Sequence, residues 1–157
     1  MVNTVHPPLK PRFWEEKSLS DMSREEWEAL CDGCGRCCVV LLEDEDAPPA
    51  TYLETKACCR LFDPTTRGCT DYAHRFTRVP GCVKVTPENA ATLQWMPESC
   101  AYRRLAEGRG LADWHPLISG RSESVAQAGI AVAPDLVNET LIPEDALWEY
   151  VTGVRET

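Results

Sequence analysis

Four of the nine cysteines in this chain lie within eight positions, in the stretch CDGCGRCC at residues 31–38. Cys31, Cys34 and Cys37 follow one another with two residues between them, a spacing that lets their sulfurs reach one metal ion from a tight turn. Soft sulfur ligands suit zinc and iron–sulfur clusters. The run C-x2-C-x2-C is typical of ferredoxin-type clusters and also serves tetrahedral zinc sites, with a distant fourth ligand in both cases. The stretch therefore predicts a centre that holds either zinc or an iron–sulfur cluster.

The thiols that would complete such a centre lie farther along the chain. They are Cys59, Cys69, Cys82 and Cys100. Cys38 directly follows Cys37 and does not easily reach the same ion, so we expect it to face a second metal, a partner thiol or the core. Eight cysteines would form two tetrahedral sites, or one cluster plus structural thiols, and the sequence leaves both arrangements open. Cys58 and Cys100 are also compatible with the core, because free cysteine is often fully buried.

A thiol–disulfide redox enzyme is the alternative from another class, with Cys37 and Cys38 or one C-x2-C pair as its dithiol. A thioredoxin-type motif follows a strand and opens a helix in a βαβ unit. Here a helix is expected before the cysteines, and four thiols stand in place of two. The pattern therefore favours a metal site over a redox dithiol. A third hypothesis is an interaction module that a metal only stiffens.

The other residue types that carry chemistry give weaker signals. His115, in DWHPL, is the best candidate for a nitrogen ligand, although a packed and hydrogen-bonded histidine is the favoured interpretation. His6 and His74 lie in polar stretches and predict solvent exposure. The tryptophans are most simply explained as core residues, namely Trp14, Trp27, Trp95, Trp114 and Trp148. No Ser–His–Asp order, phosphate-binding loop or HExxH motif is present, so the sequence names no catalytic residue.

A helix is expected to lead the chain into the cysteine stretch. Ser23 is a good N-cap, and Glu26 stands three residues later as its capping-box partner. The helix is expected to end near Leu30. Gly33 and Gly35 then alternate with the thiols, because a backbone that wraps around an ion needs positive φ angles.

The rest of the chain predicts short elements separated by turns. An apolar run at 39–42 and a plausible strand at 51–57 flank a solvated acidic turn at 43–46. Prolines that start helices predict three later ones: a short helix from Pro87, a helix from Pro97 to a cap at Gly108, and a last helix after Pro143.

These elements predict an α+β fold, a small single domain of short helices and strands organised around a cysteine-rich metal site. Twelve prolines and nine glycines predict a chain rich in loops. Residues 1–12 are polar and contain prolines, which predicts a flexible N-terminal tail. Residues 13–157 are expected to form a single cysteine-cluster domain.

The acidic balance of the chain argues against two classes of partner. Its formal net charge is −9, whereas a surface for nucleic acid or anionic membranes needs an excess of Lys and Arg. The first residues lack the apolar stretch of a signal peptide, and no apolar run approaches the ~20 residues that span a bilayer. We therefore expect a cytoplasmic protein with reduced thiols, no nucleic-acid or membrane partner, and room for an unidentified protein partner.

Longer stretches of the chain resemble a known family. They include FWEEKSLSDMSREEWEALCDGCGRCC, then WMPESCAYRRLAEG and DWHPLISG. These segments are similar to the YcgN-like bacterial cysteine-cluster family, within the wider YkgJ-type group described as a zinc- or iron-chelating domain. The resemblance covers about residues 13–150 and implies metal chelation without naming a reaction. A similar cluster accompanies flagellin lysine methylases, so the resemblance also implies an iron–sulfur-dependent enzyme component as an alternative.

The resemblance also implies which thiols are ligands. Carried over position by position, the family cysteines correspond to Cys31, Cys34, Cys37, Cys38, Cys59, Cys69, Cys82 and Cys100. Cys58 departs from the family pattern and accounts for the odd number of cysteines. Gly81 departs as well, where relatives tend to carry an acidic residue before the cysteine.

Overall fold

A computed structural model of the protein describes residues 9–155. It shows the α+β fold of short elements that the sequence predicted. The α-helices are α1 (Phe13–Glu16), α2 (Arg24–Ala29), α3 (Arg75–Arg78), α4 (Ala101–Ala106), α5 (Pro116–Ser119) and α6 (Ser124–Gln127). The 3-10 helices are η1 (Leu19–Asp21), η2 (Arg36–Cys38), η3 (Tyr72–His74), η4 (Glu139–Leu141) and η5 (Glu144–Tyr150). The strands are β1 (Val39–Glu43), β2 (Tyr52–Cys58), β3 (Phe62–Asp63), β4 (Gly68–Cys69), β5 (Val137–Asn138) and β6 (Val151–Val154).

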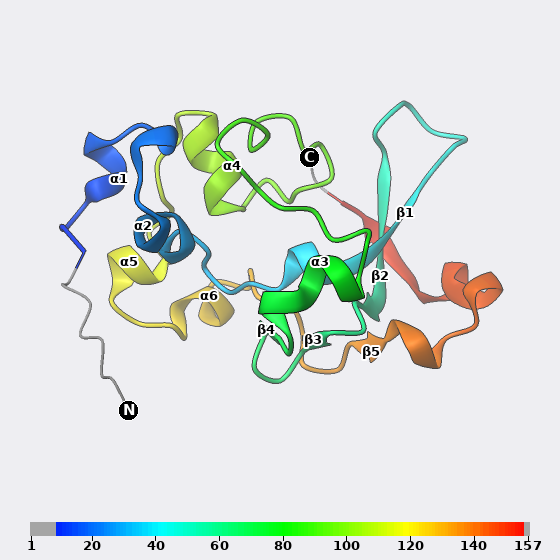
Figure 1. Ribbon diagram of the computed structural model, residues 1–157. Coiled ribbons are helices and arrows are strands. Elements are labelled where there is room, and N and C mark those ends of the chain that lie inside the picture. The colour runs from blue at the N-terminus through cyan, green and yellow to red at the C-terminus, as the bar shows by residue number, and fades with distance from the viewer. Residues whose placement is uncertain (1–8, 156–157) are drawn as a thin grey trace.

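One end of the molecule is helical, as Figure 1 shows for α1, α2, α4 and α5. The main apolar core lies among these helices. The buried side chains of this core are Phe13, Trp14, Leu30, Ala101 and Leu111. The rings of Trp27 and Tyr102 pack against each other with centroids 4.6 Å apart, and the Tyr102 hydroxyl donates to the Trp27 carbonyl oxygen at 2.8 Å. These contacts fix α2 against α4. The C-terminal end of α2, which leads to Cys31, is thereby held to the helix that Cys100 precedes.

The opposite end is a sheet with β2 at its centre. This strand pairs antiparallel with β1 and β6 and parallel with β5. The register between β1 and β2 is irregular between Val39 and Leu41, and there the Thr55 hydroxyl donates to the Val40 carbonyl oxygen at 2.7 Å. Residues 31–38 run from the helical end to the start of β1, so the cysteine stretch bridges the two ends (Figure 1).

A second, two-stranded sheet lies beside this bridge. β3 and β4 pair antiparallel, with Phe62 opposite Cys69. The Phe62 amide donates to the Cys59 carbonyl oxygen at 2.9 Å, so a turn links Cys59 directly to this hairpin. The short hairpin therefore places Cys59 and Cys69 near its open end.

The predicted capping box of α2 is confirmed. The Ser23 hydroxyl accepts a hydrogen bond from the Glu26 amide at 3.2 Å, and Glu26 Oε1 accepts one from the Ser23 amide at 2.8 Å. Lys17 also donates a hydrogen bond to the Glu26 carboxylate at 2.7 Å. The hydrogen bonds from Lys17 and from the Ser23 amide lower the pKa of Glu26. The apolar run at 39–42 forms strand β1, and the strand expected at 51–57 is present as β2.

Three of the expected helices differ in the structure. Residues 87–92 form turns and no helix, although single helical bonds are made, from the Ala90 amide to the Thr86 carbonyl oxygen at 3.0 Å and from the Leu93 amide to the Asn89 carbonyl oxygen at 3.2 Å. The helix expected from Pro97 begins only at Ala101, because Cys100 at the N-cap has a non-helical backbone with ψ of 128°. Its Gly108 cap is confirmed by a φ of +75°. The last helix is a 3-10 helix, η5, and the chain then enters β6.

Two further expectations concern the surface. Trp148 is 67% exposed on η5, so the prediction that all five tryptophans are core residues is wrong at this position. Most of the tail expected at residues 1–12 lies outside the described residues, although Leu9 packs against the helical core. Across residues 9–155, no helix is long and apolar enough to cross a membrane.

Candidate metal centre

The cysteine loop, defined here as residues 31–38, has a backbone that only its glycines adopt easily. Gly33 and Gly35 have φ angles of +72° and +79°, as predicted. Asp32 Oδ1 accepts a hydrogen bond from the Cys34 amide at 3.0 Å, and the Cys34 sulfur accepts one from the Arg36 amide at 3.5 Å. The loop therefore turns tightly, and one backbone amide already donates to one of its sulfurs.

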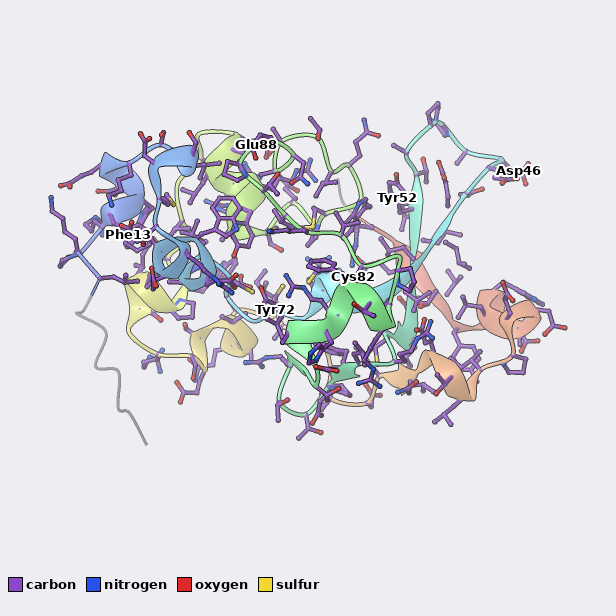
Figure 2. All side chains as sticks on the ribbon, viewed as in Figure 1. Phe13, Asp46, Tyr52, Tyr72, Cys82 and Glu88 are labelled. Carbon is purple, nitrogen blue, oxygen red and sulfur yellow. The ribbon has the colours of Figure 1, made fainter. Side chains whose placement is uncertain are left out.

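Seven of the nine thiols line one open cavity of about 540 Å³. They are Cys31, Cys34, Cys37, Cys38, Cys59, Cys82 and Cys100. Figure 2 shows Cys82 near the middle of the molecule, between the helical end marked by Phe13 and the β1–β2 hairpin that ends near Asp46. Apolar side chains such as Trp95 and Met96 complete the lining. Segments up to 69 residues apart in sequence thus bring thiols to one place.

Distinct local contacts position the thiols that come from outside the cysteine loop. The Cys59 amide donates to the Cys38 carbonyl oxygen at 2.8 Å. The Cys82 amide closes a turn onto Val79 at 2.9 Å, and Cys100 occupies the N-cap position of α4. Cys69 is half-buried in β4 and does not line the cavity.

Cys58 and His115 lie apart from this group. Cys58 is 1% exposed on β2 and does not line the cavity, so it packs as a small core side chain. His115 is also 1% exposed, and both ring nitrogens are engaged: Nδ1 accepts from the Leu117 amide at 3.0 Å, and Nε2 donates to the Leu30 carbonyl oxygen at 2.8 Å. The favoured interpretation of a packed histidine is therefore confirmed. His74 is exposed, also as predicted.

The surroundings of the cysteine loop favour neutral thiols. Burial raises the pKa of Cys31 to about 12 and that of Cys100 to about 11. A hydrogen bond with Cys38 and then burial raise the pKa of Cys37, and the two sulfurs are 4.0 Å apart. Cys31 and Cys37 count as exposed residues because they face the open cavity. Protein atoms nevertheless surround their sulfurs closely enough that desolvation raises the pKa of both thiols. A bound cation would oppose these effects and favour thiolates.

Asp32 adds an unpartnered oxygen to the same wall. Its Oδ2 is buried without a hydrogen-bond partner, the only such side-chain atom among residues 9–155. The negative charge of Asp32 raises the pKa of Cys31, Cys34 and Cys100, after the larger effect of burial. Buried polar atoms are nearly always hydrogen-bonded, so an orphaned carboxylate oxygen among thiols marks a place that suits a cation.

The thiols share a cavity but do not meet at one point. Within the described part of the chain, no three Cys, His, Asp or Glu side chains form a group arranged to hold an ion. All nine cysteines are free thiols. The cavity therefore presents the donor atoms of a metal site in an open arrangement, and their side chains would have to draw together around an ion.

A partly buried charge network behind the cysteine loop was not predicted from the sequence. Glu54 Oε1 accepts from Arg36 at 2.9 Å and from Arg155 at 3.0 Å. Burial alone would raise the pKa of Glu54. The hydrogen bonds and charges of Arg155 and Arg36 outweigh this effect, so the pKa of Glu54 is lowered. Asp32 could have been found, since it lies inside the cysteine motif. Arg155 carries no local signal, because it reaches the loop only through the pairing of β6 with β2.

Comparisons with known proteins find one matching family model and many similar curated proteins. Residues 30–101 match a family model described as "Putative zinc- or iron-chelating domain". Curated relatives named UPF0260 protein include one from Caulobacter sp. strain K31, 55% identical over 86% of this chain and 83% of the relative. One from Marinobacter nauticus is 47% identical over 88% of this chain and 93% of the relative. One from Rhodopseudomonas palustris strain HaA2 is 54% identical over 90% of this chain and 82% of the relative.

No solved structure matches the chain. The family resemblance read from the sequence is confirmed by the matched segment and by relatives that are aligned over most of their length. The chain belongs to the UPF0260 family.

Proposed function

We propose that this is a cytoplasmic metal-binding protein that holds zinc or an iron–sulfur cluster through the cysteines of its central cavity. The observation that carries the proposal is the gathering of seven thiols, from four separate segments, on one cavity wall beside an unpartnered carboxylate oxygen. A surface built only for packing has no need of that many sulfurs in one open hollow.

The residues fit such a group by the chemistry of their donor atoms. Soft thiolates select zinc and iron–sulfur clusters over hard ions such as Mg²⁺ or Ca²⁺. The ligands would come from eight cysteines, namely Cys31, Cys34, Cys37, Cys38, Cys59, Cys69, Cys82 and Cys100. Zinc would supply a structural crosslink between the two ends of the fold, and a cluster would supply electron transfer.

The chain itself prepares the site in two ways. The positive φ angles of Gly33 and Gly35 hold the cysteine loop in turns before any ligand binds. Arg155 and Arg36 bring permanent positive charge close to it, and the charge of Arg155 opposes the raised pKa of Cys37. Both features lower the free-energy cost of bringing several thiolates together.

A thiol–disulfide redox function is the second candidate, since the Cys37 and Cys38 sulfurs are 4.0 Å apart. A reactive dithiol needs a thiolate with a lowered pKa. The pKa of Cys37 is raised instead, through its hydrogen bond with Cys38 and through burial. The metal proposal therefore has the stronger support.

The direct experiment is analysis of metal and acid-labile sulfide in the full chain, purified without oxygen. Zinc without sulfide would identify a structural zinc protein, and iron with sulfide and visible absorbance would identify a cluster. Metal-free protein that stays folded while it cycles between dithiol and disulfide would refute the proposal and support the redox alternative.

A further inference from the structure

We infer that a second cavity of this protein binds a small organic anion, a molecule that carries a negatively charged group on an apolar body. This anion cavity has a volume of about 700 Å³ and is lined by residues of η1, α2, η3, α3 and the segment 84–88. Tyr72 and Glu88, both labelled in Figure 2, belong to its lining. None of its lining residues is a cysteine, so the site goes beyond the proposed metal-binding function.

Two cations at the anion cavity have no partner in the described part of the chain. Arg24 and Lys84 are exposed residues of its lining, and neither side chain makes a hydrogen bond or ion pair within residues 9–155. Every other lysine and arginine side chain of these residues makes at least one such contact. The chain has 25 acidic residues and 16 basic ones, so carboxylates are in excess. Two unpaired cations on one cavity wall therefore point to a partner from outside the chain.

A third cation is held in place at the same cavity. The guanidinium carbon of Arg75 lies 3.6 Å from the ring centroid of Tyr72 and 4.2 Å from that of Phe76. Its Nη1 donates to the Tyr72 carbonyl oxygen at 2.7 Å, and no carboxylate contacts it among residues 9–155. A guanidinium has five N–H donors, so donors remain for a ligand. Because the two rings already fix this side chain, binding an anion costs it little conformational entropy.

Two carboxylates also line the anion cavity and reduce its positive charge without cancelling it. Glu28 Oε2 accepts a hydrogen bond from the Tyr72 hydroxyl at 2.8 Å, and Glu88 is exposed. Three cations and two carboxylates leave a formal charge of +1 in the lining, whereas the whole chain carries −9. The cavity is thus a locally positive part of an acidic protein, and its charge favours a negatively charged ligand.

The rest of the wall suits the apolar body of such a ligand. Apolar side chains of the lining include Met22, Trp27, Phe76 and Val85. Phe76 is 39% exposed and Tyr72 is 47% exposed, so both rings are accessible at the cavity. Pockets for small molecules measure about 300–1,000 Å³ and combine an apolar lining with a few polar groups that fix the ligand. The volume and lining therefore fit one amphipathic organic anion.

The anion cavity adjoins the cysteine-lined cavity. Val85 lines both of them. Trp27 lines the anion cavity and Tyr102 lines the other, and their rings pack with centroids 4.6 Å apart. A bound anion would therefore share a wall of side chains with the thiols.

The test uses two fluorescent probes that differ in charge. Anilinonaphthalene sulfonate is an aromatic anion, and phenylnaphthylamine has the same kind of rings without the sulfonate. The full chain, purified without oxygen, is titrated with each probe. A double variant with Arg24→Gln and Lys84→Gln should raise the Kd for the sulfonate at least about tenfold, because it removes hydrogen bonds to a charged group. The Kd for the neutral probe should stay the same, and added salt should weaken only the binding of the sulfonate.

Two control variants separate the anion cavity from the net charge of the protein. A double variant with Lys10→Gln and Arg121→Gln makes the same change of charge outside the cavity, and it should change the Kd for the sulfonate by less than about twofold, because distant exposed charges are screened. Phe76→Ala removes part of the apolar wall and should weaken the binding of both probes.

Equal affinity of the sulfonate for the unchanged protein and for the Arg24 and Lys84 double variant overturns the inference, and so does absence of binding to the unchanged protein. If circular dichroism shows that the double variant does not fold, the single variants Arg24→Gln and Lys84→Gln replace it, and unchanged affinity in both overturns the inference. Metal content measured in the same preparations decides the proposed function separately, because the anion cavity contains no cysteine.

Discussion

Arg155 donates a hydrogen bond of 2.7 Å to the carbonyl oxygen of Arg36, the residue directly before Cys37. The same guanidinium reaches Glu54 and the Trp95 carbonyl oxygen, each at 3.0 Å, and its side chain is fully buried. One side chain near the end of the chain thus ties the cysteine loop to β2 and to the segment around Trp95. The wall that carries the thiols depends on a residue far from them in sequence.

Replacing this side chain should be costly. Arg155→Met leaves the half-buried Glu54 carboxylate with a single arginine partner and two part-buried carbonyl oxygens without donors, so the free energy of unfolding should fall by about 1–3 kcal/mol. Urea denaturation of the metal-free protein measures this. Arg78→Met, which removes an exposed pair with Asp71, is the matched control and should change stability by less than about 1 kcal/mol. Equal effects of the two variants would contradict the role assigned to Arg155.

The two loop glycines make different demands on the structure. An added Cβ at Gly35 would lie 2.5 Å from Phe62 Cζ and 2.8 Å from Val132 Cγ2, whereas one at Gly33 would meet no atom within 4 Å. Both residues have positive φ. Gly33→Ala should therefore cost about 1–2 kcal/mol of backbone strain.

Gly35→Ala should cost about 1–3 kcal/mol more than Gly33→Ala, because it adds a steric clash to the same strain. Thermal unfolding of the pair, compared at one pH, measures the difference. If the two variants unfold at the same temperature, the close packing of Phe62 on the loop is not a feature of the folded protein.

His115 is expected to matter for stability and not for metal binding. His115→Leu removes the donor for the buried Leu30 carbonyl oxygen and the acceptor for the Leu117 amide, so stability should fall by about 1–3 kcal/mol. The amount of bound metal per folded chain should stay the same. His74→Leu at an exposed position should change stability by no more than about 0.5 kcal/mol. Loss of metal in the folded His115 variant would make this residue a ligand.

The raised thiol pKa values predict how the metal-free protein responds to alkaline pH. The folded state holds the protons of Cys31 and Cys100 to about pH 12 and about pH 11, whereas the unfolded chain releases them near pH 9.0. The contribution of these buried neutral thiols to the free energy of unfolding is complete below pH 9.0. It is lost as the pH rises through the pKa values of the two thiols in the folded state. Urea midpoints should therefore fall from pH 8 upward in the metal-free protein.

Metal should suppress this alkaline loss, since coordinated thiolates carry no proton in the folded state. Binding at neutral pH should also release protons, which a weakly buffered titration with a pH indicator detects. The Cys31→Ala variant should show a shallower fall of the metal-free midpoint with pH. A midpoint that rises with pH in the metal-free protein would contradict the assignment of buried neutral thiols.

Local signals in the sequence predicted the parts of the fold that depend on neighbouring residues. Ser23 and Glu26 specify their capping box within four residues, and Gly33 and Gly35 reveal the turns of the cysteine loop by residue type alone. The helix expected at Pro87 was wrong because the same kind of signal, a polar cap followed by proline, also suits the turns that form there.

The long-range features had no comparable signal. The sequence offered Cys59, Cys82 and Cys100 as partners for the cysteine loop, but only the fold shows that they share one cavity. Arg155 reaches the loop through strand pairing, which a periodic pattern in one strand does not specify. The absence of nucleic-acid and membrane partners, expected from the net charge of −9, stays a prediction.

The central claim is that sulfur atoms of this cavity bind a metal, and X-ray absorption at the metal edge tests it most directly. The full chain, purified without oxygen, should show a first shell made of sulfur, at about 2.3 Å if the metal is zinc. A first shell of oxygen and nitrogen alone, or a protein without stoichiometric zinc or iron, would contradict the account.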